Sequence, residues 1–117
     1  IVSYGDITYH PDIITRLYRI QGEIAIAYDR LWENLWSKRF ADPLEDAETF
    51  AVDYQGYLLN IGQRAETLRQ IQGQYMGLLK FTPRGWSGIV LNDGLVYAAL
   101  GDGKILALDS TKLEKNV

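Results

Sequence analysis

The chain has no cysteine and a single histidine among its 117 residues. The lack of cysteine excludes disulfides and thiolate zinc sites, and one histidine leaves little material for a histidine-based metal site or catalytic triad. The same lack favours a cytoplasmic setting. No apolar run approaches the ~20 residues that a membrane span needs, so we expect no membrane partner.

The chain also lacks a strong excess of charge of either sign. The formal net charge is -3, and the 12 Lys and Arg residues are scattered rather than gathered in a stripe, so we expect no nucleic-acid partner. Hydrophobic residues make up 47% and charged residues 23%, which is ordinary for a soluble globular protein. A chain of this length fits one domain, so residues 1–117 are predicted to form a single unit.

Apolar runs and a helical pattern alternate at the start of the chain. Residues 1–8 read as a strand, residues 11–20 as an amphipathic helix, and residues 24–27 as a second buried strand that ends at Asp29. Strand, helix and strand in this order predict a parallel crossover unit. A short helical face follows, formed by Leu31, Trp32, Leu35 and Trp36.

The rest of the chain favours antiparallel pairing. Residues 50–53 and 57–61 flank a Gly-containing turn and predict a hairpin, while residues 73–81 form a long strand-like run. Between them, residues 64–71 suggest a helical turn. A second hairpin is predicted from residues 95–100 and 105–108 around the glycine-rich turn at 101–103. The fold class is therefore α/β, with a mixed sheet that has a parallel start and antiparallel additions.

Two acids stand at the ends of apolar strands, Asp6 and Asp109. If these strands are neighbours, the two carboxylates could share one Mg²⁺ and leave coordination positions for phosphate oxygens and water. The alternative is that both acids cap turns.

Aromatic side chains offer a second kind of site. Trp32 and Trp36 lie four residues apart on one helical face, and with Tyr75 they could enclose a quaternary ammonium group by cation–π attraction. The alternative is a core face, because Leu31 and Leu35 extend the same stripe. The charged segment from Arg39 to Glu48 is either a loop near an acceptor site or a solvated loop with local ion pairs.

Several blocks in this order resemble the nucleotidyltransferase family that includes phosphocholine cytidylyltransferases and sugar-phosphate nucleotidyltransferases. The resemblance runs over residues 2–86. Its blocks are Tyr4-Gly5-Asp6-Ile7, Asp29 with Trp32 and Trp36, Arg39, Pro43-Leu44 with Asp46-Ala47-Glu48, Ile61-Gly62, Ile71-Gln72-Gly73-Gln74-Tyr75-Met76-Gly77-Leu78, and Phe81-Thr82-Pro83.

The resemblance implies a Rossmann-like nucleotide-diphospho-sugar transferase fold, present in part. It implies a Mg²⁺-dependent enzyme that transfers a nucleotidyl group, CMP from CTP in our first assignment, to a phosphorylated small molecule and releases pyrophosphate. Phosphocholine or a sugar 1-phosphate is the expected acceptor. Asp6 and Asp109 are the expected metal ligands and catalytic residues. The substrate-binding assignment covers Trp32, Trp36, Arg39, Glu48 and Tyr75.

The sequence departs from the family in two ways. No segment matches the Gly-rich G-x-G-x-R loop that cradles the triphosphate, and the chain opens on a strand pattern without Met. We therefore expect a fragment that begins inside a longer protein and is inactive, or nearly so, alone. The segment between Trp86 and Val96 is also shorter than in the family.

Two other functions remain open at this point. A glycosyltransferase that uses a nucleotide sugar would call for a D-x-D pair at the first acid, and Asp6-Ile7-Thr8 lacks the second Asp. A degenerate, non-catalytic binding domain fits Leu106 and Ala107, which stand where the family has Trp and Glu.

Overall fold

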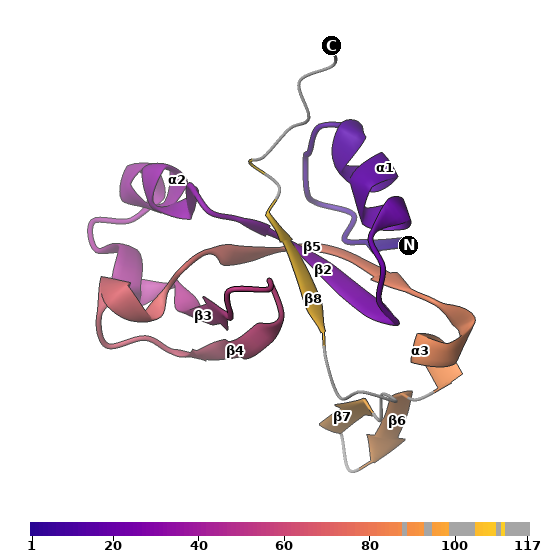
Figure 1. Ribbon diagram of the computed structural model, residues 1–117. Coiled ribbons are helices and arrows are strands. Elements are labelled where there is room, and N and C mark those ends of the chain that lie inside the picture. The colour runs from indigo at the N-terminus through magenta and orange to yellow at the C-terminus, as the bar shows by residue number, and fades with distance from the viewer. Residues whose placement is uncertain (88, 93–94, 99–104, 110, 112–117) are drawn as a thin grey trace.

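A four-stranded sheet lies at the centre of the computed structural model, which describes residues 1–87, 89–92, 95–98, 105–109 and 111 (Figure 1). The strand order is β1-β5-β2-β8. β5 runs antiparallel to both β1 and β2, and β8 runs parallel to β2. The strands span Val2–Ser3 (β1), Ile24–Asp29 (β2), Gln74–Phe81 (β5) and Leu106–Asp109 (β8).

The predicted parallel crossover is present, but its two strands are not neighbours in the sheet. Helix α1 (Asp12–Arg19) does connect β1 to β2, and both strands run in the same direction because each is antiparallel to β5. They do not pair with each other, since β5 lies between them. The predicted first strand also shrinks to two residues, because a turn at Gly5 and Asp6 ends it early. Periodicity fixes which faces of a strand are apolar, but not which strand becomes its neighbour.

Helix α1 forms where the sequence predicts it. Pro11 stands at its start, where its fixed φ suits a helix. Asp12 in the first turn and Arg16 and Arg19 in the last turn carry charges that suit the helix dipole. Ile13 and Leu17 are buried, and they pack with Ala25, Ala27 and Leu78 of the sheet. The helix therefore covers one face of β2 and β5.

A second helix and a hairpin form the other side of the molecule (Figure 1). Helix α2 spans Trp32–Arg39, followed by a 3₁₀ turn at Pro43–Glu45. The predicted helical face is only half buried, because Trp32 lies in a core cluster with Ala47, Ala65 and Ile71 while Leu31 and Leu35 are exposed. No helix in the described part of the chain is long and apolar enough to cross a membrane.

The first predicted hairpin is confirmed. β3 (Glu48–Val52) pairs antiparallel with β4 (Leu58–Arg64). Asp53 closes the turn, since its Oδ1 accepts hydrogen bonds from the backbone N–H groups of Gln55 and Tyr57, each at 2.9 Å. Gly56 has a φ of 88°, a conformation that glycine adopts without a side-chain clash. The helical turn predicted for residues 64–71 is a 3₁₀ turn at Leu68–Gln70.

The second predicted hairpin is wrong. α3 (Pro83–Ser87) follows β5, and then β6 (Ile89–Asn92) pairs antiparallel with β7 (Leu95–Ala98). β8 does not belong to this hairpin and pairs parallel with β2 in the central sheet. The turn predicted at residues 101–103 lies outside the described residues. A long-range partner, β2, therefore replaces the local one that the glycine-rich turn suggested.

The core around β5 is sensitive to loss of side-chain volume. Leu78 has no exposed surface, so Leu78→Ala should lower the free energy of unfolding by about 3 kcal/mol through lost burial and a residual cavity. Leu59→Ala is the matched control, because Leu59 is 67% exposed and its loss should cost at most about 0.5 kcal/mol. Urea denaturation followed by circular dichroism measures both. Equal losses for the two variants would contradict this packing.

Candidate functional site

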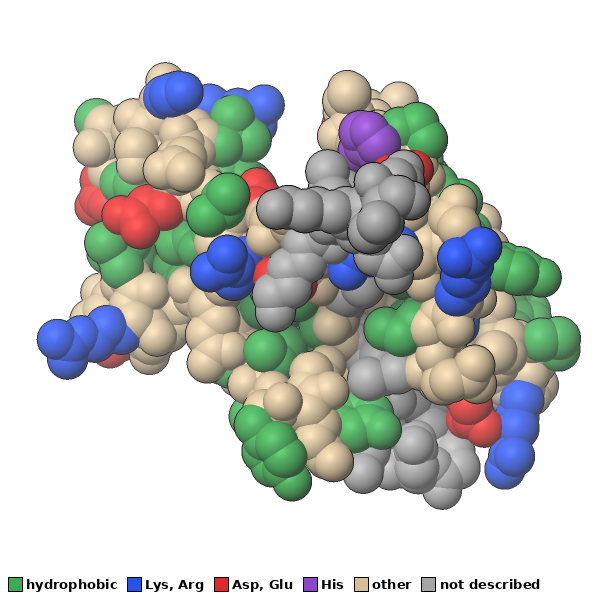
Figure 2. All heavy atoms as spheres, turned by 45° about the horizontal axis from the view of Figure 1, so that its top comes forward, with side chains coloured by type: hydrophobic (Ala, Val, Ile, Leu, Met, Phe, Trp, Pro, Cys, Tyr) green, Lys and Arg blue, Asp and Glu red, His purple; other side chains and the backbone are tan. Residues whose placement is uncertain are grey.

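A cavity of about 410 Å³ lies where β2 ends, α2 packs and β5 begins. Figure 2 shows a notch in the upper edge of this face of the molecule. Two carboxylates, one guanidinium and two aromatic rings contribute to the lining. The lining residues are Asp6, Ile7, Thr8, Asp29, Leu35, Trp36, Arg39, Gln74, Tyr75 and Met76. The cavity is therefore lined by charged groups of both signs and by aromatic rings.

Asp29 enters this cavity because it is the last residue of β2. One of its carboxylate oxygens, Oδ1, accepts a 2.7 Å hydrogen bond from the backbone N–H of Leu31, which fixes the turn into α2. The carboxyl ends of the parallel strands β2 and β8 meet at the same edge of the sheet, the usual place for ligand chemistry in α/β folds. The sequence marks Asp29 as a strand end, the same signal that Asp6 and Asp109 give, and it is a site candidate that the sequence reasoning left out.

Asp109 ends β8 and is 6% exposed. Its Oδ1 accepts hydrogen bonds from the backbone N–H of Thr111 at 2.9 Å and from the Thr111 hydroxyl at 2.6 Å, so this oxygen caps a turn. Its Oδ2 is buried and has no hydrogen-bond partner among the described residues. Arg30 Nε lies 3.3 Å away as an ion pair, without hydrogen-bond alignment. One oxygen is therefore held by hydrogen bonds, and the other is buried beside Arg30 without a hydrogen bond among the described residues.

The charge of Asp109 also reaches Tyr28, its partner in the β2–β8 register. Burial raises the pKa of the Tyr28 hydroxyl, and the Asp109 carboxylate raises it further. The edge of the sheet therefore carries a carboxylate in surroundings that favour the neutral form of its neighbour.

Asp6 lies in the turn after β1, exposed at the rim of the cavity. It shares this cavity with Asp29, whereas Asp109 is not among the lining residues. Carboxylate oxygens are the donors that Mg²⁺ prefers, and Mg²⁺ is usually held by one or two of them together with water and phosphate. The described residues contain no group of three or more His, Asp or Glu side chains placed to hold a metal ion. The donor chemistry thus fits a Mg²⁺ ion that takes its other ligands from substrate and water.

Tyr75 presents its ring to the cavity from β5. Its ring meets that of Tyr4 edge to face, with centroids 5.9 Å apart. Burial raises the pKa of Tyr75, and the charge and hydrogen bond of Tyr4 raise it further. Gly77 makes this arrangement possible, because it has a φ of 77° and a Cβ there would lie 2.5 Å from the Tyr4 ring. The glycine in the block that carries the family resemblance therefore gives Tyr4 room beside β5.

The two tryptophans differ in depth. Trp36 lines the cavity, and its indole N–H donates a 3.3 Å hydrogen bond to Asp46 Oδ2. Trp32 packs edge to face against it, with centroids 6.1 Å apart, but is only 3% exposed. Trp36 and Tyr75 are thus the rings that line the cavity, and Trp32 supports Trp36 from the core.

Arg39 and Glu48, the two charged residues assigned to substrate binding, lie in different places. Arg39 lines the cavity from the last turn of α2. Glu48 opens β3 and lines a separate groove beside Gly62. Gln74 connects the two regions, since its Oε1 accepts a 3.2 Å hydrogen bond from the Glu48 N–H and its Nε2 donates to the Glu48 carbonyl at 2.7 Å. Gln74 is buried and was not assigned a role by sequence reasoning.

Comparison with known proteins supports the resemblance. No family model matches this chain, and no solved structure matches it. A CTP:phosphoglutamine cytidylyltransferase of Campylobacter jejuni subsp. jejuni is 43% identical to it over 90 residues. The match covers 77% of this chain and 35% of the relative, so the chain spans about a third of the length of that protein. The similarity to the cytidylyltransferase and nucleotidyltransferase family is thereby confirmed over most of the chain.

The proton held by Tyr75 should make stability depend on alkaline pH. Because its folded pKa lies above the ordinary value of 10.0, its contribution is complete below pH 10 and is lost as the pH rises through the folded pKa. We expect the free energy of unfolding to fall less steeply above pH 10 in Tyr75→Phe than in the unmodified chain. Urea denaturation at a series of pH values measures this slope. Tyr54→Phe, at an exposed ring, is the control, and a slope left unchanged by Tyr75→Phe would contradict the assignment.

Proposed function

We propose that this chain contributes the acceptor-binding and metal-binding residues of a CTP-dependent cytidylyltransferase. It is similar to a cytidylyltransferase over 90 of its residues. The observation that carries the proposal is the cavity at the end of β2. It combines the carboxylates of Asp6 and Asp29 with the guanidinium of Arg39 and the rings of Trp36 and Tyr75. The buried Oδ2 of Asp109, which accepts no hydrogen bond among the described residues, lies on the neighbouring strand at the same sheet edge.

The reaction transfers a cytidylyl group to a phosphorylated small molecule. A phosphate oxygen of the acceptor attacks the α-phosphorus of CTP and forms a new P–O bond. The bond from that phosphorus to the bridging oxygen breaks, and pyrophosphate leaves with the electron pair. The attacking phosphate is already an anion, so positioning contributes more to the rate than proton transfer.

Asp6 and Asp109 are the proposed holders of Mg²⁺, with Asp29 as a further carboxylate beside them. The ion would offset the negative charge that develops on the pyrophosphate leaving group. The support for this assignment is the buried Oδ2 of Asp109, which accepts no hydrogen bond among the described residues, and the position of Asp6 and Asp29 on one cavity. Arg30 would hold the Asp109 carboxylate in place through its ion pair.

The lining favours an acceptor that carries both a phosphate and an ammonium group. Arg39 can pair with phosphate, because a guanidinium binds two phosphate oxygens at once. Asp29 and the faces of Trp36 and Tyr75 suit a cation. Phosphocholine and phosphoglutamine both carry these two groups, whereas a neutral sugar 1-phosphate would leave the carboxylate and the rings without a partner. We therefore propose an acceptor that carries a phosphate group and a separate ammonium group, called a phosphorylated amine below.

A transfer assay tests the proposed reaction. The complete polypeptide that contains residues 1–117 is incubated with CTP, Mg²⁺ and phosphocholine, phosphoglutamine or a sugar 1-phosphate, and mass spectrometry detects the CDP-linked product. We expect product with a phosphorylated amine. Asp109→Asn should lower kcat about a hundredfold, the scale seen when one group that stabilises developing charge is removed. Glu33→Gln, at an exposed position of α2, is the control. Absence of product with all three acceptors would contradict the proposal.

Acceptor binding tests the role of Arg39 separately. We expect Arg39→Gln to weaken the binding of the preferred phosphorylated amine about tenfold, because a charge-assisted hydrogen bond to phosphate is lost. Isothermal titration calorimetry measures the Kd. Arg69→Gln removes the same charge from an exposed position away from this cavity and should leave the Kd unchanged. An equal effect of both substitutions would indicate a general charge effect and would contradict the placement of phosphate at Arg39.

A further inference from the structure

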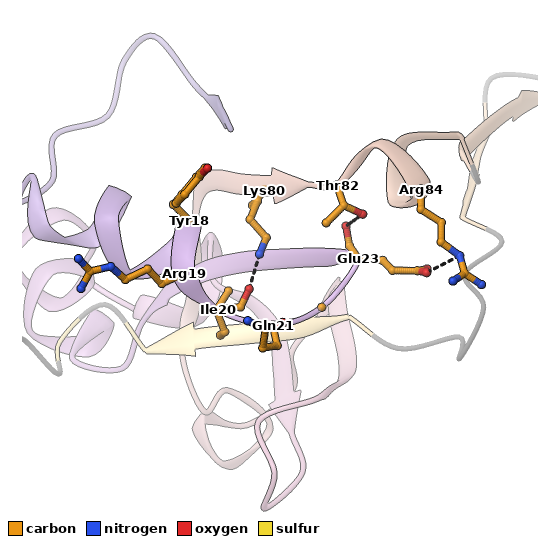
Figure 3. A pocket seen from close by; sticks show the side chains of 9 residues that line it. Tyr18, Arg19, Ile20, Gln21, Glu23, Lys80, Thr82 and Arg84 are labelled. Carbon is orange, nitrogen blue, oxygen red and sulfur yellow. Dashed lines mark hydrogen bonds and ion pairs between the residues drawn. The ribbon is translucent and has the colours of Figure 1, made fainter.

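A second cavity, of about 500 Å³, lies at the opposite end of β2, between the end of α1 and the start of α3 (Figure 3). β2 begins beside this cavity at Ile24 and ends at Asp29 in the candidate site, a separation of about 17 Å for a strand of this length. The two cavities share no lining residue. The second cavity therefore requires a separate explanation.

Lys80 is the central side chain of this second cavity. It comes from β5, is 8% exposed, and its ammonium donates a hydrogen bond to the carbonyl oxygen of Ile20. In the part of the chain that the structure describes, no carboxylate forms an ion pair with this ammonium. An ammonium has three N–H donors, and a buried cation costs free energy unless it is paired. Burial accordingly lowers the pKa of Lys80.

Two arginines add positive charge around Lys80. Figure 3 shows Arg19 of α1 and Arg84 of α3 on opposite sides of Lys80, with their side chains directed away from it. Arg84 Nε lies 2.8 Å from Glu23 Oε1, so one carboxylate offsets one of the three cations. The net charge of the whole chain is -3, and this local excess of positive charge therefore runs against its overall balance. Cations gathered in a concave site attract anions more strongly than scattered ones do.

We propose that this second cavity binds a small molecule with a phosphate group and at least two negative charges. Lys80 would meet one phosphate oxygen as a point charge, and Arg19 and Arg84 would bind further oxygens through their planar guanidinium groups. A single carboxylate would neutralise only one cation, whereas a polyanion bound at Lys80 offers further oxygens to whichever arginine turns inward. The ring of Tyr18, exposed at the rim, offers a flat surface for an organic part of the ligand.

Inorganic pyrophosphate is the probe that tests this proposal. Its titration into the ¹⁵N-labelled chain is followed by NMR in the presence of EDTA, which excludes Mg²⁺-dependent binding at the candidate site. The backbone signals of Gly22 and Thr82 should shift in a saturable way, while those of Asp6 and Tyr75 should stay in place. Absence of saturable shifts at Gly22 and Thr82, or larger shifts at Asp6 and Tyr75, would overturn the proposal.

Substitutions then show which charges bind the probe. Lys80→Met should raise the Kd about tenfold or more, and Glu23→Gln should lower it a few-fold, because one removes a charged donor and the other a repelling carboxylate. Lys38→Met, on the exposed surface of α2, is the charge-matched control and should have no effect. If Lys80→Met does not fold, the double variant Arg19→Gln with Arg84→Gln replaces it and should also raise the Kd. A Kd unchanged by every cavity variant, or raised equally by Lys38→Met, would overturn the proposal.

Discussion

The pairing of β5 with β2 is the interaction on which the rest of the structure depends. Ile24 lies opposite Phe81 at one end of this pair, and Asp29 lies opposite Gln74 at the other. Both cavities take residues from these two ends, Lys80 beside the first and Tyr75 beside the second. Leu78 fills the core between them. One antiparallel ladder thus sets the positions of the chemically active side chains at both edges of the sheet.

Local elements could be predicted from the sequence because local chemistry determines them. The apolar spacing of Ile13 and Leu17 specifies α1, and a Gly-containing turn specifies the β3–β4 hairpin. Strand pairing could not be predicted in the same way. β8 was assigned to a hairpin with its nearest neighbour in sequence, yet it pairs with β2, because a strand that is distant in sequence satisfies its backbone hydrogen bonds as well as a local one does. Neighbours in a sheet are a property of the whole core.

The candidate site was predictable in part. Trp36, Arg39 and Tyr75 line one cavity, as their predicted substrate-binding role requires, and the predicted metal ligand Asp6 lines it too. Trp32, Glu48 and the other predicted metal ligand, Asp109, do not line this cavity. Helical spacing places Trp32 and Trp36 on the same side of α2, but it does not specify how deeply each side chain is buried. Asp29 was missed as a site residue although it follows a strand as clearly as Asp109 does. Its place in the cavity depends on how the end of β2 packs against α2 and the start of β5, which the sequence does not specify.

The glycine at position 77 limits how the length of β5 can change. β2 and β5 shift register here, with Ile26 opposite Leu79 but Tyr28 opposite Tyr75, so β5 uses extra residues around Gly77. A one-residue deletion in β5 would turn every side chain on one side of it to the opposite face. Either Tyr75 or Lys80 would then leave its cavity. Insertions and deletions within β5 should therefore be rare among related chains.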